Sequence, residues 1–221
     1  MLEARNVSKT YGRTKALAEV SLEIAEGEIV AVTGPSGAGK STLMHCLAGV
    51  VRPESGEVVL DGRRIDTLVE AELTALRRES FGIVFQFGEL VPELTAAENV
   101  ALPLLFNRRD RREAMATAAE WLARLNVSDC ADQRIGELSG GQRQRVAVAR
   151  ALVTGPRVVF ADEPTGSLDS TGGEQVLRAL LDTARADRTA VVMVTHDNRV
   201  AAYADREIVL RDGAVPAGAP R

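Results

Sequence analysis

The hydrophobic pattern of the chain changes repeatedly between strand-like and helix-like stretches. Residues 2–11 and 16–24 alternate polar and apolar positions, as half-exposed antiparallel strands do. Continuous apolar runs, which are typical of buried strands in a parallel sheet, cover residues 28–33, 81–85, 158–163 and 190–195. The pattern therefore predicts antiparallel and parallel strands in one chain, separated by stretches of other character.

Helical character dominates from about Thr95 to Val153. Two segments there, Thr95 to Glu98 and Ser139 to Gln142, match the capping-box pattern that starts helices. A helix over residues 111–125 would gather apolar side chains on one face, and Trp121 lies near that face. We therefore expect Trp121 to be a core side chain rather than a functional aromatic.

Between the apolar run at 28–33 and a helical stretch at 41–48 lies the phosphate-binding pattern G-x-x-x-x-G-K-[ST]. Its residues are Gly34, Pro35, Ser36, Gly37, Ala38, Gly39, Lys40, Ser41 and Thr42. Glycines let the backbone bend so that N–H groups and the positive end of the helix dipole point at an anion. Lys40 adds a mobile positive charge, and Ser41 offers a hydroxyl to Mg²⁺. A flexible Gly/Ser turn is the alternative interpretation, and the flanking strand and helix argue against it.

Composition narrows the classes of partner. A formal charge of -4 over 221 residues disfavours a nucleic-acid partner bound through its phosphates. Cys46 and Cys130 lie far apart without metal spacing, which is typical of a reduced cytosol. The N-terminus lacks the apolar core of a signal peptide, so we expect no export. No apolar run approaches the ~20 residues needed to cross a bilayer, so a membrane role would come through a partner.

Polar side chains stand at the ends of the buried runs. Asp162 and Glu163 close the run at 158–163; after a phosphate loop we expect Asp162 to hold Mg²⁺ and Glu163 to orient or deprotonate water. A simple strand end is the alternative for this pair. Gln86 and His196 follow two other runs, and carboxyl ends of parallel strands meet at one edge. That shared edge favours a functional His196 over a structural one.

A second anion site is predicted at Ser139, Gly140, Gly141 and Gln142, where glycines leave a helix start bare. Lys40 already serves one phosphate chain. A second site therefore suggests a second nucleotide or a second subunit.

Taken in order, these motifs resemble the nucleotide-binding subunit of an ABC transporter over nearly the whole chain. The most specific is Leu-Ser-Gly-Gly-Gln at 138–142, accompanied by Gln86, Ser-Leu-Asp at 167–169 and His196. The resemblance implies an α/β fold, a P-loop NTPase core with a mostly parallel sheet, an N-terminal antiparallel β subdomain and an inserted helical subdomain. The RecA-like core with the β subdomain would cover residues 1–87 and 156–221, and the helical subdomain about 88–155.

The same resemblance implies an ATPase that uses ATP and Mg²⁺. It would act as a head-to-tail dimer. Each ATP would lie between the phosphate loop of one subunit and the Leu-Ser-Gly-Gly-Gln segment at 138–142 of the other, which we call the signature. Tyr11, whose place before Gly12 favours a turn residue, looks by resemblance like the residue that stacks on adenine. Gln86 looks like the glutamine that senses magnesium and the partner, Asp169 like a dimer-communication residue, and His196 like the γ-phosphate switch.

Residues 162–166 (Asp-Glu-Pro-Thr-Gly) and 93–103 resemble the branch of lipoprotein-releasing, macrolide-exporting and cell-division ATPases. Ser167 departs from that branch, which usually has asparagine there, and Phe87-Gly88-Glu89 replaces its commoner Phe-Asn. The branch implies a separate transmembrane permease and a peripheral place on the cytoplasmic face of the membrane. Lipoprotein, peptide, macrolide and haem all remain open as cargo.

The main alternative is a cell-division or cell-wall regulator in which the same ATP cycle signals to a membrane partner and moves no solute. ABC proteins of DNA repair or translation fit less well, because they need a long coiled coil or two cassettes in one chain. Neither an internal repeat nor a sustained heptad pattern occurs here. Few residues follow the last predicted strand, so we expect no added regulatory domain at the C-terminus.

Overall fold

The computed structural model describes residues 1–86 and 88–216; Phe87 and residues 217–221 lie outside the description. The chain forms two compact units. The first unit combines Met1–Arg77 with Ala190–Arg221, and the second is Arg78–Thr189.

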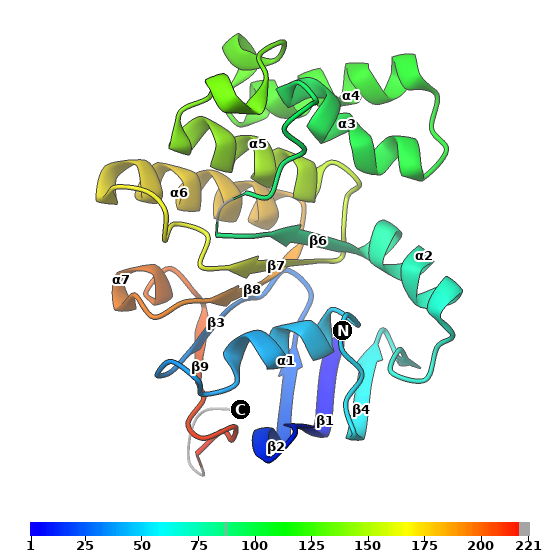
Figure 1. Cartoon of the computed structure of the whole chain (residues 1–221), viewed down its shortest axis with the longest axis vertical. Coiled ribbons are helices and arrows are strands. Elements are labelled where there is room, and N and C mark those ends of the chain that lie inside the picture. Colours follow the sequence, from blue (N-terminus) through cyan, green and yellow to red (C-terminus); the bar gives the residue numbers. More distant parts are fainter. Residues whose placement is uncertain (87, 217–221) are drawn as a thin grey trace. The chain divides into compact units, whose positions relative to one another are not determined.

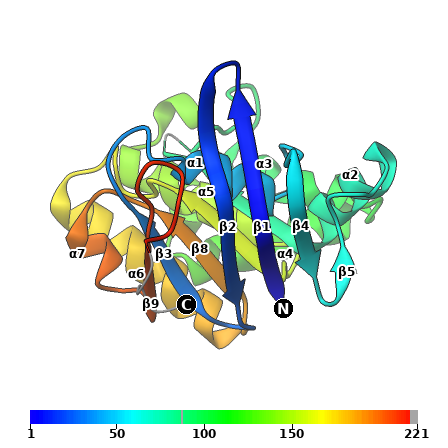
Figure 2. The same ribbon diagram turned by 90° about the horizontal axis from the view of Figure 1, so that it is seen from below.

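The first unit contains an antiparallel sheet of β1 (Leu2–Tyr11), β2 (Thr14–Ile24), β4 (Ser55–Leu60) and β5 (Arg63–Arg64). The strands follow the order β2-β1-β4-β5, and Figure 2 shows them side by side. Asp61 and Gly62 join β4 to β5 with φ angles of 49° and 80°, as a two-residue hairpin turn requires. The predicted alternation at the N-terminus is therefore confirmed as antiparallel strands.

The first unit also holds three parallel strands, β3 (Ile29–Thr33), β8 (Ala190–Val194) and β9 (Arg206–Val209), with β3 paired to both others. Every residue of β3 and β8 is buried, as the continuous apolar runs predicted. Helix α1 (Lys40–Leu47) follows β3, and the short α7 (Asn198–Ala201) follows β8. Helix α2 (Glu70–Ser80) crosses the boundary between the units.

The second unit begins with the parallel pair β6 (Phe81–Val84) and β7 (Val158–Asp162). Phe81 and Phe160 pack edge to face there, with ring centroids 5.2 Å apart. Helix α6 (Ser170–Ala186) follows β7. This helix was not among the predicted elements. Its buried residues nevertheless follow a helical period, which is visible in the sequence: Val176, Leu177, Leu180, Leu181 and Ala184.

The remaining helices of the second unit are α3 (Ala96–Phe106), α4 (Arg111–Arg124) and α5 (Gly140–Leu152), with 3₁₀ turns at Ser128–Cys130 and Ile135–Glu137 (Figure 1). Both predicted capping boxes are present: Thr95 caps α3 and Ser139 caps α5. Trp121 is buried, as expected, and the Arg124 guanidinium lies over its ring at 4.1 Å. In the described part of the chain, no helix is long and apolar enough to cross a membrane.

Candidate functional site

The phosphate-binding pattern forms the loop between β3 and α1, entirely within the first unit. Gly39 is the N-cap of α1 in a left-handed conformation with φ 100°, and none of the described side chains caps that helix. The first turn of α1 also carries no acidic residue. The first N–H groups of a helix have no partner inside the helix, so this start offers bare donors and a positive dipole end. An anion is the natural partner of such a helix start.

Two glycines of this loop are required by close packing. A Cβ at Gly34 would collide with the carbonyl oxygen of Leu210, and a Cβ at Gly39 would collide with that of Ala16. Neither oxygen can move cheaply, because both belong to backbone. The loop is therefore fitted against the ends of β2 and β9, which fixes the orientation of its N–H groups.

Lys40 and Ser41 begin α1. Lys40 Nζ donates to the carbonyl oxygens of Gly34 and Pro35 at 2.8 and 3.0 Å, so the ammonium group lies over the loop backbone. The Ser41 side chain is exposed, whereas Leu43 is fully buried against the core. A cation and a hydroxyl thus stand at the same helix start as the bare N–H groups.

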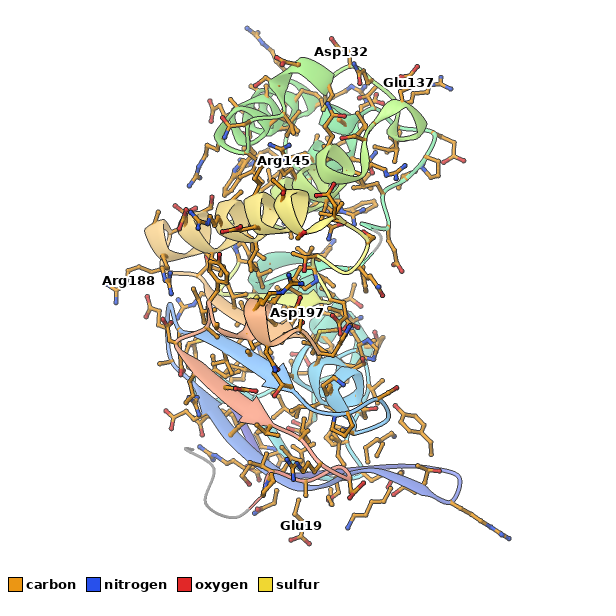
Figure 3. All side chains as sticks on the ribbon, turned by 90° about the vertical axis from the view of Figure 1, so that its left-hand side faces the viewer. Glu19, Asp132, Glu137, Arg145, Arg188 and Asp197 are labelled. Atoms are coloured by element: carbon orange, nitrogen blue, oxygen red, sulfur yellow. The ribbon has the colours of Figure 1, made fainter. Side chains whose placement is uncertain are left out.

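His196 lies near the same end of the first unit. Strand β8 runs parallel to β3 with Val194 opposite Val32, so the residues that follow the two strands leave the sheet at one edge. His196 is exposed, and Asp197 beside it caps α7 (Figure 3). Hydrogen bonds from Arg199 hold the pKa of Asp197 below its ordinary value, so a negative charge stays next to the histidine.

Tyr11 ends β1, where it pairs with Thr14 across the hairpin. Its side chain is 50% exposed, and Lys9 Nζ lies 5.6 Å from the ring centroid. The ring is thus available to stack on a planar group.

The second unit collects a separate set of polar residues at the ends of β6 and β7. Val84 pairs with Ala161, so Gln86 and Asp162 leave the parallel pair at the same edge, as predicted. Glu163 follows with φ 46°, a left-handed conformation that is uncommon for a residue other than glycine. The Gly166 N–H donates to the Glu163 carbonyl oxygen at 3.0 Å and closes a turn. Strained backbone of this kind occurs often at functional sites.

The signature segment enters α5 through a complete capping box. The Gln142 N–H donates to Ser139 Oγ at 3.3 Å, and the Ser139 N–H donates to Gln142 Oε1 at 2.8 Å. These bonds leave the N–H groups of Gly140 and Gly141 outside the box. The start of α5 is therefore less bare than the sequence pattern suggested, and it offers two donors between its own capping residues.

Asp169 is the N-cap of α6 and accepts a hydrogen bond from the Gly172 N–H at 2.7 Å. The carboxylate is exposed while it performs this structural task. Asp169 therefore fixes the direction in which the segment after β7 enters a long helix.

Sequence reasoning missed the contacts that hold Gln86. Ser167 Oγ donates to the Gln86 carbonyl oxygen at 2.9 Å, and Gly166 lies against the Gln86 side chain. The signal in the sequence is indirect: Ser167 departs from the branch that the sequence resembles, which usually has asparagine there.

The two units thus present different sets of polar groups. The first offers an anion cradle with a cation, a hydroxyl and a histidine. The second offers two carboxylates and an amide at a strand edge. Oxygen donors are the ligands that Mg²⁺ prefers. The first unit offers the Ser41 hydroxyl, and the second offers the Asp162 carboxylate and the Gln86 amide oxygen, so the donors of each unit fit that ion by type.

Comparisons with known proteins agree with this chemistry. The family described as "ABC transporter" matches residues 17–166. The macrolide export ATP-binding/permease protein MacB 1/2 of Paracoccus denitrificans (strain Pd 1222) is 45% identical over 228 residues that cover 100% of this chain. The chain spans 34% of that protein's length.

Two solved structures are also similar. One is the bacterial ABC transporter cassette MJ0796, which is dimeric in two solved structures, one of them in a post-hydrolysis state bound to ADP and Pi. It aligns with a TM-score of 0.89 and 43% identity, and the alignment covers 97% of this chain and 96% of that chain. The protein cbiO1 from Clostridium perfringens, part of the ABC transporter complex cbiONQ, aligns with a TM-score of 0.88 and 29% identity over 97% of this chain and 86% of its own.

Proposed function

Because the chain belongs to the ABC transporter family, whose ATP-binding domains hydrolyse ATP, we propose that it drives an exporter or extractor of the macrolide and lipoprotein type. The observation that carries the assignment as an ATPase is the uncapped start of α1. Glycines, Lys40 and N–H groups without a side-chain cap lie together there, and we propose that they bind the phosphates. The 45% identity to a macrolide export protein supports the branch.

In this proposal, the loop from Gly34 to Thr42 holds the phosphates of ATP. The N–H groups at the start of α1 donate to phosphate oxygens, and Lys40 exchanges its bonds to backbone carbonyls for stronger bonds to phosphate. Tyr11 stacks on the adenine ring. His196 faces the γ-phosphate and responds to its presence.

Ser41, Gln86 and Asp162 hold Mg²⁺ in the proposal. The ion, when bound, neutralises the charge that builds on the phosphates during hydrolysis. The three side chains contribute a hydroxyl, an amide oxygen and a carboxylate, and they orient the phosphate chain by holding its counter-ion in place.

Glu163 is the proposed general base. It lies one residue beyond β7, in a left-handed turn closed by the Gly166 N–H. There it accepts a proton from water as the water attacks the γ-phosphate.

The signature supports a head-to-tail dimer. Gly140 and Gly141 keep two N–H donors outside the capping box, and a second copy of the chain can bring its ATP to them. The related cassette MJ0796 is dimeric in its solved structures, which supports the proposal. Asp169 communicates between the two copies in this arrangement.

The proposed partner of the dimer is a membrane permease, which would place the chain at the cytoplasmic face of the membrane. The predicted separate permease subunit stays a prediction, since the macrolide export relative carries both functions in its name. The division into a core and a helical subdomain at about 88–155 likewise stays a proposal.

Replacing Glu163 with glutamine tests the function. In Glu163→Gln the amide still accepts and donates hydrogen bonds but cannot take a proton, so turnover should fall on the order of 10²- to 10⁴-fold. Nucleotide binding and the ATP-bound dimer should persist, as measured by fluorescent-nucleotide titration and size-exclusion chromatography. Hydrolysis at the wild-type rate would remove Glu163 from the role of base.

A further inference from the structure

In the chain segment that carries Gln86, side chains bind the described residues before and after it, in addition to a backbone bond from the Gly88 N–H to the Phe85 carbonyl oxygen at 3.1 Å. After β6 ends, Gln144 Nε2 on α5 donates to the Phe85 carbonyl oxygen at 2.9 Å. Arg150, also on α5, donates to the carbonyl oxygens of Gly88 and Glu89 at 2.9 and 2.8 Å. Gln144 is buried, and burial lowers the pKa of Arg150. These bonds fasten both ends of the segment firmly to α5.

Gln86 itself is fastened differently, to the turn that follows β7. Ser167 Oγ donates to its carbonyl oxygen at 2.9 Å. Its side chain lies against Gly166: a Cβ there would come within 2.8 Å of Gln86 Nε2 and 3.4 Å of Cγ and Cδ. Among the described residues, the Ser167 hydroxyl thus binds the Gln86 backbone, and the Gln86 amide fills the space beside Gly166, which has no side chain. We refer to Gly166 and Ser167 together as the glutamine seat.

The seat belongs to the same short turn as Glu163. The Gly166 N–H donates to the Glu163 carbonyl oxygen at 3.0 Å, so the seat and Glu163 lie in one hydrogen-bonded turn. A displacement of this turn would therefore move Glu163 and Gln86 together. The Ser167 hydroxyl is neutral and exposed, whereas the Arg150 bonds to Gly88 and Glu89 are charge-assisted and Gln144 is buried. A neutral hydrogen bond is weaker than a charge-assisted one, so we expect the Ser167 bond to be the weaker of these side-chain contacts.

We propose that Gly166 and Ser167 are positioning residues that seat Gln86 at the magnesium ion and keep it in register with Glu163. The proposal rests on the proposed function, which assigns Gln86 to the ion. Ser167 sets the position of the Gln86 backbone, and Gly166 leaves room for the Gln86 amide. Ser167 and Gly88 are both points at which the sequence departs from the branch it resembles, and both belong to the fastening of this one segment.

Two substitutions disturb the seat in different ways. Ser167→Ala removes the hydroxyl donor, and Gly166→Ala pushes the flexible end of the Gln86 side chain aside while its own backbone, which is not left-handed, tolerates alanine. Ser167→Ala should raise the Mg²⁺ concentration that gives half-maximal ATPase activity by about threefold to tenfold, the effect of losing one hydrogen bond, and Gly166→Ala should raise it in the same direction by displacing the Gln86 amide. Affinity for a fluorescent ATP analogue in EDTA should not change. Ser167→Thr keeps the hydroxyl and should restore the wild-type Mg²⁺ dependence.

Matched controls lie elsewhere in the second unit. Ser170→Ala makes the same change three residues later, at an exposed position, and Gly136→Ala adds a methyl group where nothing in the described chain lies within 4 Å. Both should match wild type. If Ser167→Ala also matches wild type while Gln86→Ala raises the Mg²⁺ requirement, the seat is wrong. If Gln86→Ala leaves the requirement unchanged, the role of Gln86 in the proposed function fails, and the seat fails with it.

Two measurements need no turnover. Amide hydrogen exchange of a peptide spanning residues 82–92, in nucleotide-free protein, should rise in Ser167→Ala and stay at the wild-type level in Ser167→Thr. Mn²⁺ titration by electron paramagnetic resonance, with a non-hydrolysable ATP analogue, should show the same weakening as the Mg²⁺ dependence. Faster exchange with unchanged Mn²⁺ affinity would mean that the bond only stabilises the fold, which overturns the proposal.

Discussion

The two glycine-rich helix starts of the chain look alike in sequence and differ in structure. Helix α1 begins at Gly39, which has no side chain and leaves the first N–H groups without a cap. Helix α5 begins at Ser139, whose hydroxyl and whose partner Gln142 cap each other. The first start depends on an external anion to satisfy its donors, whereas the second is largely satisfied by itself.

The glycines at the two helix starts also differ in the space that a side chain would find. At Gly34 and Gly39, a Cβ would collide with backbone of the same chain. At Gly141, a Cβ would meet nothing within 4 Å in the described chain apart from its own helix, and at Gly140 it would meet only the flexible end of Leu168 at 3.1 Å. Packing inside the chain therefore explains Gly34 and Gly39, but it does not explain Gly141. A partner that approaches the bare side of α5 does explain it, and this supports a composite site in a dimer.

The largest expected effect comes from removing the cation at the uncapped start. Lys40→Ala should weaken nucleotide binding by about 10²-fold or more, since it removes a charged hydrogen bond to phosphate in a partly buried cradle. Titration with a fluorescent ATP analogue measures this effect, and circular dichroism checks that the variant is folded. Equal affinities for Lys40→Ala and wild type would contradict the assignment of the cradle.

A smaller effect on binding, with loss of turnover, is expected at the capped start. Gly141→Asp places a negative charge where the second copy's γ-phosphate would lie, so hydrolysis should be abolished while the first nucleotide still binds. A mixed dimer with Lys40→Ala keeps one intact composite site, and counting trapped ATP identifies it. Normal hydrolysis by Gly141→Asp alone would rule out the composite site.

A matched pair of variants can separate the role of Ser139 as a helix cap from a role in ATP hydrolysis. Ser139→Ala and Thr95→Ala each remove the hydroxyl of a capping box, and each should cost about 1 kcal/mol of stability in urea unfolding. If the start of α5 takes part in the site, only Ser139→Ala should also slow turnover, whereas Thr95→Ala should keep the wild-type rate. Equal turnover in both variants would reduce Ser139 to a structural cap.

The smallest effect is a pH dependence that distinguishes the two capping boxes. The hydrogen bond that Glu98 accepts from the Thr95 N–H, together with its pair with Arg111, holds the pKa of Glu98 below its ordinary value. The folded pKa is the lower one, so the stabilisation is complete above the unfolded pKa of about 4.3 and is lost as the pH falls through the folded pKa. The box of α5 uses Gln142 and has no such dependence.

Amide exchange from pH 7 to 4, corrected for intrinsic rates, measures this difference. Protection at the start of α3 should fall with pH while protection at the start of α5 stays constant. Glu98→Gln gives α3 the same kind of box as α5 and should remove the pH dependence. An equal loss of protection at both helix starts would point to general acid unfolding instead.

Most elements of this fold could be predicted because their signals are local. The alternation in β1, the apolar runs of β3 and β8 and both capping boxes depend on residues a few positions apart. Helix α6, which the sequence analysis did not predict, carries an equally local signal in the helical spacing of its buried residues. The identity of the phosphate loop and of the signature also followed from short patterns, because a helix start and its ligand donors are built from consecutive residues.

Tertiary structure alone decided which of these residues meet. Gly34 needs to be glycine because the chain returns with Leu210, and Ser167 can hold Gln86 only because β6 and β7 pair with Val84 opposite Ala161. Strand pairing brings together residues far apart in sequence, and no periodicity within either segment specifies the partner of a particular carbonyl oxygen. The sequence by itself therefore determined the elements and the chemistry they offer, while the tertiary structure decided how Gln86 is held and why Gly34 and Gly39 cannot carry a side chain.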